Sequence, residues 1–152
     1  MDYILELRQL VGSRPLIMVG ATLLLLNRDD QLLMMRRTDN GCWGVPGGGM
    51  EPGETFEETI NRESREEIGV TVRQLEFFNL YSGPDFHYIY PNGDEIYGVT
   101  AVYLAHNFDG RIMLNSEEHS EYCFFDISNL PENTSPPIKP ILKDLIKTYG
   151  EK

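Results

Sequence analysis

Residues 48–70 read GGMEPGETFEETINRESREEIGV, a glycine turn that runs directly into a segment dense in charged side chains. Pro52 and Gly53 end the turn, and the residues after them have the composition of a helix. We predict this helix from about residue 55 to residue 68, closed by Gly69 as a left-handed cap. The stretch decides the fold because the rest of the chain reads mainly as strands, which such a helix would flank.

The side of this helix that should face a core becomes acidic halfway along. With about 100° between successive residues of an α-helix, Phe56 and Ile60 point the same way, and that side continues to Glu63 and Glu67. Glu66 lies on the adjoining flank. Carboxylates that face a core are costly unless something neutralises them. Glu63, Glu66 and Glu67 stand at i, i+3 and i+4, which brings them close enough to share a hard cation such as Mg²⁺ or Mn²⁺.

Two further features of the stretch suit such a cation. The preceding glycines allow close backbone approach and can offer a carbonyl to a metal or amides to a phosphate. Arg62, within one turn of Glu66, is placed to hold a carboxylate by a forked ion pair. The alternative is a solvated, salt-bridged surface helix, which accounts for most Glu-rich helices. The interrupted apolar face and the glycines upstream favour the cation site.

The stretch resembles the Nudix box, Gly-x5-Glu-x7-Arg-Glu-U-x-Glu-Glu-x-Gly-U, in which U is a bulky aliphatic residue. The matching positions are Gly48, Glu54, Arg62, Glu63, Glu66, Glu67, Gly69 and Val70. Ser64 is the one departure, since it occupies a U position, and it concerns the packing of the helix rather than the metal site. The resemblance covers roughly residues 15–149, including WGVPGG at 43–48 and FFDISNLP at 124–131. It implies the Nudix fold, an α/β/α sandwich with a curved mixed β-sheet.

The resemblance also implies hydrolysis of the diphosphate linkage in a nucleoside diphosphate joined to another group, with Mg²⁺ or Mn²⁺ as cofactor. Glu63 and Glu67 would be the principal metal ligands, and Gly48, or Gly47 before it, would lend a backbone carbonyl. Glu66 would be a further ligand or the carboxylate that activates water. The implied reaction is displacement at phosphorus by a water that the metals make more acidic.

Other residues complete the site that the resemblance implies. Glu54 and Arg62 would be the pair that orders the motif. A carboxylate outside the box often completes such sites in the family, and Glu117, Glu118 and Glu121 lie in the loop before the last predicted strand. We take Glu118 as the representative candidate, because nothing in the sequence separates the three. The alternative is a simple acidic loop.

Substrate specificity would rest with residues outside the box. Arg36 and Arg37 end the strand before the glycine loop, where one can reach a phosphate or stay solvated, and we take Arg37 as the candidate. Aromatic residues gather around a loop and hairpin after the box, where a ring could stack a base: Tyr81, Phe86, Tyr88, Tyr90 and Tyr97. We take Tyr81 as the candidate, with ordinary sheet packing as the alternative for all five.

The chain of 152 residues reads as one domain, with a leading segment over 1–14 and a core over 15–149. A short helix over residues 2–10 carries an apolar stripe that we expect to pack within the molecule: Tyr3, Leu7 and Leu10. Strands are predicted at 15–27, 31–36, 71–81, 86–90, 95–106, 111–114 and 122–126, and a last helix at 141–149. Family habit suggests a homodimer contact through the leading helix or a strand edge.

Composition limits the partners and the compartment. Against 24 Asp and Glu there are 13 Lys and Arg, a formal charge of −11, which disfavours broad nucleic-acid binding and adhesion to anionic membranes. The longest apolar run, residues 16–26, is about half of the roughly 20 residues that span a bilayer. Cys42 and Cys123 form no CxxC pair, and we expect free thiols in a reducing, cytoplasmic compartment.

These features predict a metal-dependent pyrophosphohydrolase of a small nucleotide, such as ADP-ribose, a nucleotide sugar or a modified nucleoside triphosphate. A second hypothesis is removal of diphosphate from RNA 5′ ends, against which the acidic charge and the absence of a Lys/Arg run argue. A third is a Nudix-fold sensor that binds nucleotide without cleaving it, against which the intact set of three glutamates argues. The box specifies the chemistry and leaves the substrate open.

Overall fold

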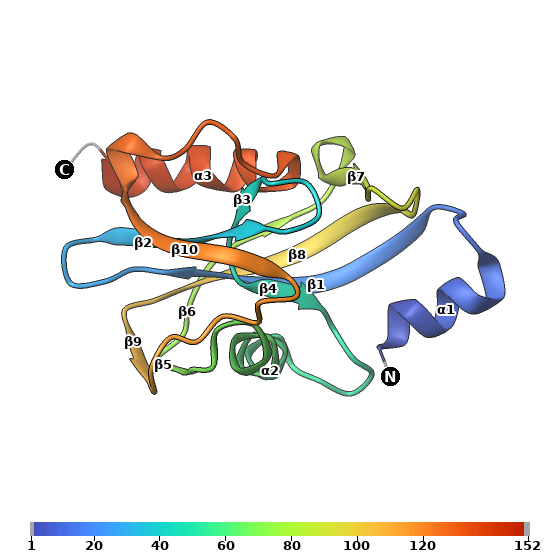
Figure 1. Cartoon of the computed structure of the whole chain (residues 1–152), viewed down its shortest axis with the longest axis horizontal. Helices are drawn as coiled ribbons and strands as arrows, with labels where there is room; N and C mark the ends of the chain where they lie inside the picture. Colours follow the sequence, from blue (N-terminus) through green and yellow to red (C-terminus); the bar gives the residue numbers. More distant parts are fainter. Residues whose placement is uncertain (1, 151–152) are drawn as a thin grey trace.

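A mixed sheet forms the centre of the fold in the computed structural model, which describes residues 2–150 and leaves residues 1, 151 and 152 outside (Figure 1). Its strand order is β4-β1-β8-β6, with β7 paired to β8. The long strands β1 and β8 run parallel, and the other pairs are antiparallel. The bounds are β1 Leu16–Leu25, β4 Gly47–Gly49, β6 Glu76–Tyr81, β7 His87–Ile89 and β8 Glu95–Ala105.

The mixed sheet predicted from the sequence is accompanied by two smaller sheets, which the remaining strands form. In the first, β2 (Gln31–Arg37) lies between β10 (His119–Asp126) and β3 (Trp43–Gly44). In the second, β5 (Thr71–Arg73) pairs with β9 (Asn107–Asp109). β2 and β1 meet only at a bridge next to their turn, because β4 pairs with the free edge of β1 and β2 pairs along its length with β10.

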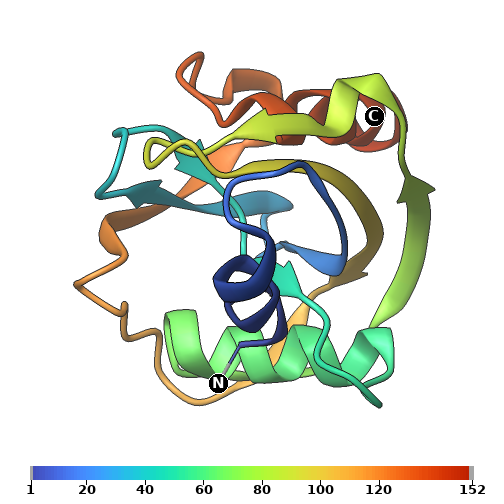
Figure 2. The ribbon, with the colours of Figure 1, turned by 90° about the vertical axis from the view of Figure 1, so that its right-hand side faces the viewer.

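Helices α2 (Phe56–Ile68) and α3 (Lys139–Leu145) lie on opposite sides of the strands, and α1 (Tyr3–Val11) lies at one end (Figures 1 and 2). The predicted acidic helix is therefore confirmed. Thr55 begins it with a capping box to Glu58, and Gly69 ends it in the left-handed conformation with a φ of 73°. The last helix agrees with its prediction and continues as a π-helical turn, Ile146–Gly150. None of the described helices combines the length and apolar character needed to cross a bilayer.

Strand β1 joins two clusters of buried side chains, because its successive residues point to opposite faces of the sheet. Leu23 and Leu25 pack with Ile60 and Ile68 of α2. Leu24 belongs to the cluster on the other face, under α3. The Leu-rich run of β1 is therefore buried on both faces, which explains why it shows no alternation of polar and apolar residues.

Two sequence predictions about local structure are wrong. No strand forms at 111–114, because this segment closes the end of α2 instead: the amide of Met113 donates to the carbonyl of Ile68 at 2.9 Å, and that of Asn115 to the carbonyl of Glu67 at 3.1 Å. The predicted strand at 71–81 is divided into β5 and β6, with Gln74 between them at a φ of 56°.

Polar contacts rather than apolar packing hold helix α1. None of its residues is buried, and Leu10 of the predicted apolar stripe is 83% exposed. The amide of Tyr3 donates to the carboxylate of Glu51, with the shorter contact at 3.0 Å. The guanidinium of Arg8 donates to the carbonyl of Glu95 at 2.6 Å. The helix is thereby tied both to the glycine loop and to the start of β8.

Candidate functional site

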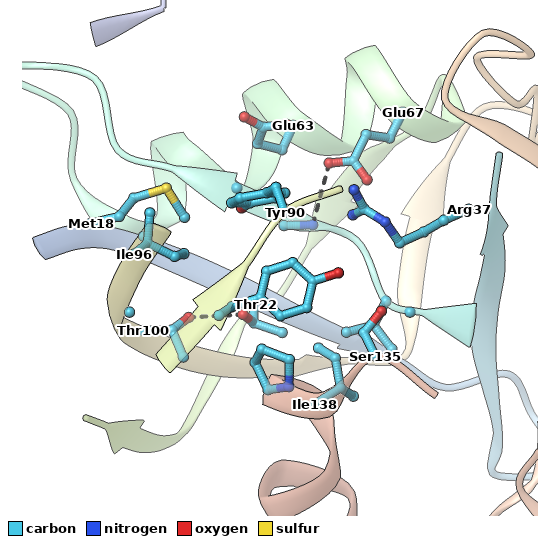
Figure 3. A pocket seen from close by; sticks show the side chains of 18 of the residues that line it. Met18, Thr22, Arg37, Glu63, Glu67, Tyr90, Ile96, Thr100, Ser135 and Ile138 are labelled. Carbon is cyan, nitrogen blue, oxygen red and sulfur yellow. Dashed lines mark hydrogen bonds between the residues drawn. The ribbon is translucent and has the colours of Figure 1, made fainter. Parts of the chain in front are cut away.

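A cavity of about 590 Å³ opens along β1, beside the acidic face of α2 (Figure 3). Its lining comes from segments that are far apart in the sequence: β1, the end of β2, the glycine strand β4, α2, β8, the loop at 117–119 and the segment that leads into α3. The acidic helix, the glycine turn and the first strands therefore meet around one space. This volume lies within the range of about 300–1,000 Å³ that is usual for small-molecule sites.

Glu63 and Glu67 form the acidic wall of this cavity. Glu67 is only 6% exposed, and the side chain of Glu63 is 16% exposed. The amide of Gly47 donates to Oε1 of Glu67 at 3.4 Å. Burial raises the pKa of Glu63 and raises that of Glu67 far more, because removing a carboxylate from water disfavours its charged form. Burial therefore favours the protonated form of each of these carboxyl groups over its charged form.

Arg62 holds the acidic wall in place through hydrogen bonds and ion pairs. Its Nε and Nη2 donate to the two oxygens of Glu54 at 2.7 and 3.0 Å, a forked ion pair. Nη1 donates to Oε1 of Glu63 at 2.9 Å, and Nη2 also donates to the carbonyl of Gly49 at 2.8 Å. The hydrogen bonds from Arg62 are the largest reason that the pKa of Glu54 falls to about 2. The guanidinium of Arg62 therefore links Gly49 of β4, Glu54 and Glu63 by hydrogen bonds.

Three glycines whose backbones are closely packed lie next to the two glutamates: Gly20, Gly47 and Gly48. A Cβ on Gly48 would lie 2.5 Å from the carboxylate of Glu63, and one on Gly47 would lie 2.5 Å from the carbonyl oxygen of Ala21. A Cβ on Gly20 would collide with the carbonyl oxygen of Gly48. Sequence reasoning missed Gly20, although a glycine inside an apolar strand is a signal for close backbone approach.

Glu66 does not join the buried pair. Its side chain is 59% exposed and lies 3.7 Å from Nη1 of Arg62, on the outer side of the brace. Within residues 2–150, no three acidic, histidine or cysteine side chains gather closely enough to hold a metal ion. The structure therefore brings together two of the three glutamates at i, i+3 and i+4, and the carboxylate of the third faces solvent.

Of the three glutamates predicted in this loop, Glu117 and Glu118 line the cavity, whereas Glu121 lies on β10 and does not line it. The charge of Glu118 adds to the rise in the pKa of Glu67, so the two carboxyl groups interact across the cavity. Thr38 pins the loop to the end of β2, since its amide donates to the carbonyl of Glu118 at 3.0 Å. Glu121 instead forms an exposed ion pair with Arg36 at 3.9 Å.

The two candidate substrate contacts have different outcomes. Arg37 lines the cavity and forms a forked ion pair with Asp39 at 2.9 and 2.7 Å, which raises the pKa of Arg37. Tyr81 does not line the cavity, because it is buried among the side chains under α3, where its hydroxyl donates to Asp144 at 2.7 Å. Among the other aromatic candidates, Phe86, Tyr88 and Tyr90 line the cavity.

Several residues of the cavity carry no signal in the sequence. Thr22 and Thr100, on neighbouring strands, share a hydrogen bond of 2.8 Å at its wall, near Ser135 and Ile138 (Figure 3). His119 is buried, and its Nδ1 has no hydrogen-bond partner among the described residues. Burial also lowers the pKa of His119 and favours a neutral imidazole. These groups can hydrogen-bond a ligand without adding charge.

The donor set fits a hard divalent cation. Carboxylate and carbonyl oxygens are the ligands that Mg²⁺ and Mn²⁺ prefer, and Glu63, Glu67 and the carbonyl of Gly48 supply them at one wall of the cavity. Two buried carboxyl groups are costly to ionise, and a bound cation would offset that cost.

Comparison with known proteins gives a consistent result. Residues 16–145 match the family model described as the NUDIX domain. An ADP-ribose pyrophosphatase from Methanocaldococcus jannaschii is 32% identical over 126 residues, which cover 81% of this chain and 70% of that protein. An uncharacterized Nudix hydrolase, YvcI, from Bacillus subtilis is 30% identical over 129 residues, 82% of this chain and 77% of that protein. The crystal structure of a MutT NUDIX hydrolase from Burkholderia pseudomallei matches with a TM-score of 0.71 at 27% identity, covering 84% of this chain and 96% of that one.

Proposed function

The chain belongs to the Nudix hydrolase family, and we propose that it cleaves the diphosphate linkage of a small nucleotide with a divalent cation as cofactor. The observation that carries this proposal is the buried pair Glu63 and Glu67, which stands at the wall of a nucleotide-sized cavity beside the Gly48 carbonyl. ADP-ribose, nucleotide sugars and modified nucleoside triphosphates are the substrates considered. The relative from M. jannaschii, named an ADP-ribose pyrophosphatase, supports this range.

In this proposal Glu63, Glu67 and the Gly48 carbonyl hold Mg²⁺ or Mn²⁺. When bound, the cation would neutralise phosphoryl oxygens and make a water molecule more acidic. Arg62 acts as a positioning residue, because it holds Glu63 and the backbone of Gly49 in one arrangement.

The carboxylates outside the buried pair have separate parts in the proposal. Glu54 keeps Arg62 oriented, and its low pKa keeps it charged as the partner of the guanidinium. Glu118 accepts the proton of the attacking water, since it lines the cavity and its charge acts on Glu67. Glu66 has the role of a further ligand by its position in the family pattern, and its side chain lies 3.7 Å from Nη1 of Arg62.

The two alternative hypotheses lead to different behaviour. An RNA 5′ end would bring a chain of phosphates to a cavity whose charged side chains are mostly acidic, and the formal charge of −11 opposes it further. A non-catalytic sensor would bind nucleotide and release no product. The buried carboxyl pair favours the hydrolase, because burying two acids is costly unless they serve a cation.

Turnover of a nucleotide panel in Mg²⁺, with products separated by chromatography, tests the proposal. Wild type should cleave at least one small nucleotide, and Glu67→Gln should abolish this activity while keeping the fold. Glu76→Gln is the matched control, because it makes the same chemical change on an exposed residue of β6 that does not line the cavity. Cleavage by Glu67→Gln at the wild-type rate would overturn the metal role, and calorimetric binding without any product would favour the sensor.

A further inference from the structure

A second, smaller cavity lies beneath helix α1 and adjoins the first. Its volume is about 280 Å³, and its lining combines Ile4, Leu5 and Arg8 of α1 with side chains of the turn at 90–94. Six of the described residues line both cavities: Asp2, Met18, Gly48, Glu63, Tyr90 and Ile96. This smaller cavity, which we call the α1 chamber, is therefore reached at the acidic wall itself.

The α1 chamber lies on the side of the site that Arg37 does not reach. Figure 3 shows Met18 and Ile96 on one side of the larger cavity and Arg37 on the other, with Glu63 between them. Whole ligands usually fill about 300–1,000 Å³, so a volume of about 280 Å³ suits one part of a ligand whose remainder lies in the larger cavity. The chamber offers apolar contact from α1 and polar groups from the turn, a mixture that suits a sugar ring.

Helix α1 closes this chamber without the help of buried apolar surface. It has nine residues, none of them buried, and a helix of that length is only marginally stable by itself in water. Its place depends on Arg8, whose side chain is 9% exposed. Nη2 of Arg8 donates to the carbonyl of Glu95 at 2.6 Å, and Nε lies 3.8 Å from the carboxylate of Asp94. Arg8 therefore fixes the distance between α1 and the opposite wall of the chamber.

The start of α1 is fixed to the other end of the chamber. The amide of Tyr3 donates to the carboxylate of Glu51, and the amide of Glu51 donates to Oε1 of Glu54 at 2.8 Å. A Cβ on Gly49 would lie 3.9 Å from Cγ1 of Ile4, so the side chain of Ile4 lies over the glycine strand. Ile4 is thereby held at the wall of the chamber, next to the backbone that adjoins the cation site.

We propose that α1 determines specificity: it covers, in the α1 chamber, the group that the diphosphate joins to the nucleoside. The inference rests on the proposed hydrolase function and adds to it residues outside the matched domain, which begins at residue 16. Ile4 contacts the group directly. Arg8 is a positioning residue, because its guanidinium is engaged with the carbonyl of Glu95 and acts through the place of the helix. The larger cavity takes the nucleoside.

Filling the chamber tests whether a ligand uses it. Calorimetry with Mg²⁺ compares the α,β-methylene analogues, which resist cleavage, of ADP-ribose and of ADP, which lacks the second group. Ile4→Trp should weaken binding of the ADP-ribose analogue about tenfold, because the larger side chain occupies the space, and should leave binding of the ADP analogue unchanged. Leu10→Trp is the matched control on the same helix, at a residue that is 83% exposed and lines neither cavity, and should change neither affinity.

Arg8→Ala tests the positioning role. It should raise KM for the best nucleotide of the panel about tenfold and leave kcat unchanged, because the chamber loosens while the acidic wall keeps its contacts. Arg8→Lys keeps one donor for the carbonyl of Glu95 and should recover part of the lost affinity. Arg28→Ala, in the exposed turn between β1 and β2, lines neither cavity and should behave as wild type. A purely structural role of Arg8 would lower the midpoint of thermal unfolding and the active fraction without raising KM.

The outcomes separate this inference from the function on which it rests. If nucleotides are cleaved but Ile4→Trp binds both analogues as Leu10→Trp does, the inference is overturned and the hydrolase function stands. The same holds if Ile4→Trp weakens both analogues equally, or if Arg8→Ala lowers kcat at constant KM, because α1 would then not act through the second group. If no nucleotide of the panel is cleaved, the proposed function fails and the inference falls with it.

Discussion

The substitution Gly48→Ala, which adds one methyl group, tests whether activity depends on the position of the Glu63 carboxylate. An ideal Cβ on Gly48 would lie 2.5 Å from the carboxylate carbon of Glu63 and 2.5 Å from its Oε1. Ordinary van der Waals contact begins at 3.4 Å, so the carboxylate must move by about 0.9 Å, the difference between 3.4 and 2.5 Å. A displacement of about 1 Å from the productive geometry is enough to cost about 100-fold in rate.

The fold should tolerate this change even though activity does not. The new methyl group meets the end of a flexible side chain rather than backbone, and replacing glycine by alanine at a compatible backbone position gains about 0.4–1 kcal/mol of stability. The assay is kcat/KM on the best substrate of the panel, together with the midpoint of thermal unfolding. Gly49→Ala is the matched control, because its Cβ would meet nothing closer than the Sδ of Met18 at 3.6 Å.

Equal turnover by Gly48→Ala and Gly49→Ala would refute the reasoning, since the carboxylate position would then not matter. A double-mutant cycle gives a second check. Glu63→Asp shortens the side chain and makes room for the methyl group, so the rate losses of Gly48→Ala and Glu63→Asp should be less than additive when the two are combined. Additive losses would show that the methyl group acts somewhere other than on Glu63.

Four further predictions concern stability. Because burial raises the pKa of Glu67, metal-free wild type should lose stability as the pH rises above the unfolded value of 4.5, and Glu67→Gln should melt at a higher temperature than wild type at pH 8 in chelator. Mg²⁺ at 100 times its dissociation constant should stabilise wild type by about 2.7 kcal/mol, roughly 5–10 °C, and Glu67→Gln far less. Arg62 lowers the pKa of Glu54 to about 2. The charged Glu54 carboxylate therefore stabilises the fold fully above pH 4.5, and this stabilisation is lost as the pH falls from 4.5 to about 2. The urea midpoints of wild type and Glu54→Gln should accordingly converge across that pH range. The buried hydroxyl of Ser64 has no hydrogen-bond partner among the described residues, so Ser64→Ala should raise the free energy of unfolding by about 1 kcal/mol; a loss of stability would contradict this.

The acidic helix was predictable because its signals are local. The Thr55 capping box and the left-handed Gly69 act within a turn of the helix ends, and a helical period is enough to place Glu63 and Glu67 on the side that packs inward. The brace between Arg62 and Glu54 follows from the family pattern and is reproduced by contacts of 2.7 and 3.0 Å. Prediction fails at 111–114, because backbone donors there satisfy carbonyls at the end of α2.

The sequence by itself determined the helix, its acidic face and the class of reaction, because those depend on residues within a few turns of one another. Only the tertiary structure decided what faces the cavity. The pairing of β6 and β7 with β8 places Tyr81 in the core and Tyr88 at the wall of the cavity. The pairing of β4 with β1 places Gly20 against Gly48. Burial and charge balance in the cavity have the same cause, because they depend on which distant strands and loops are brought together, and no local pattern encodes that.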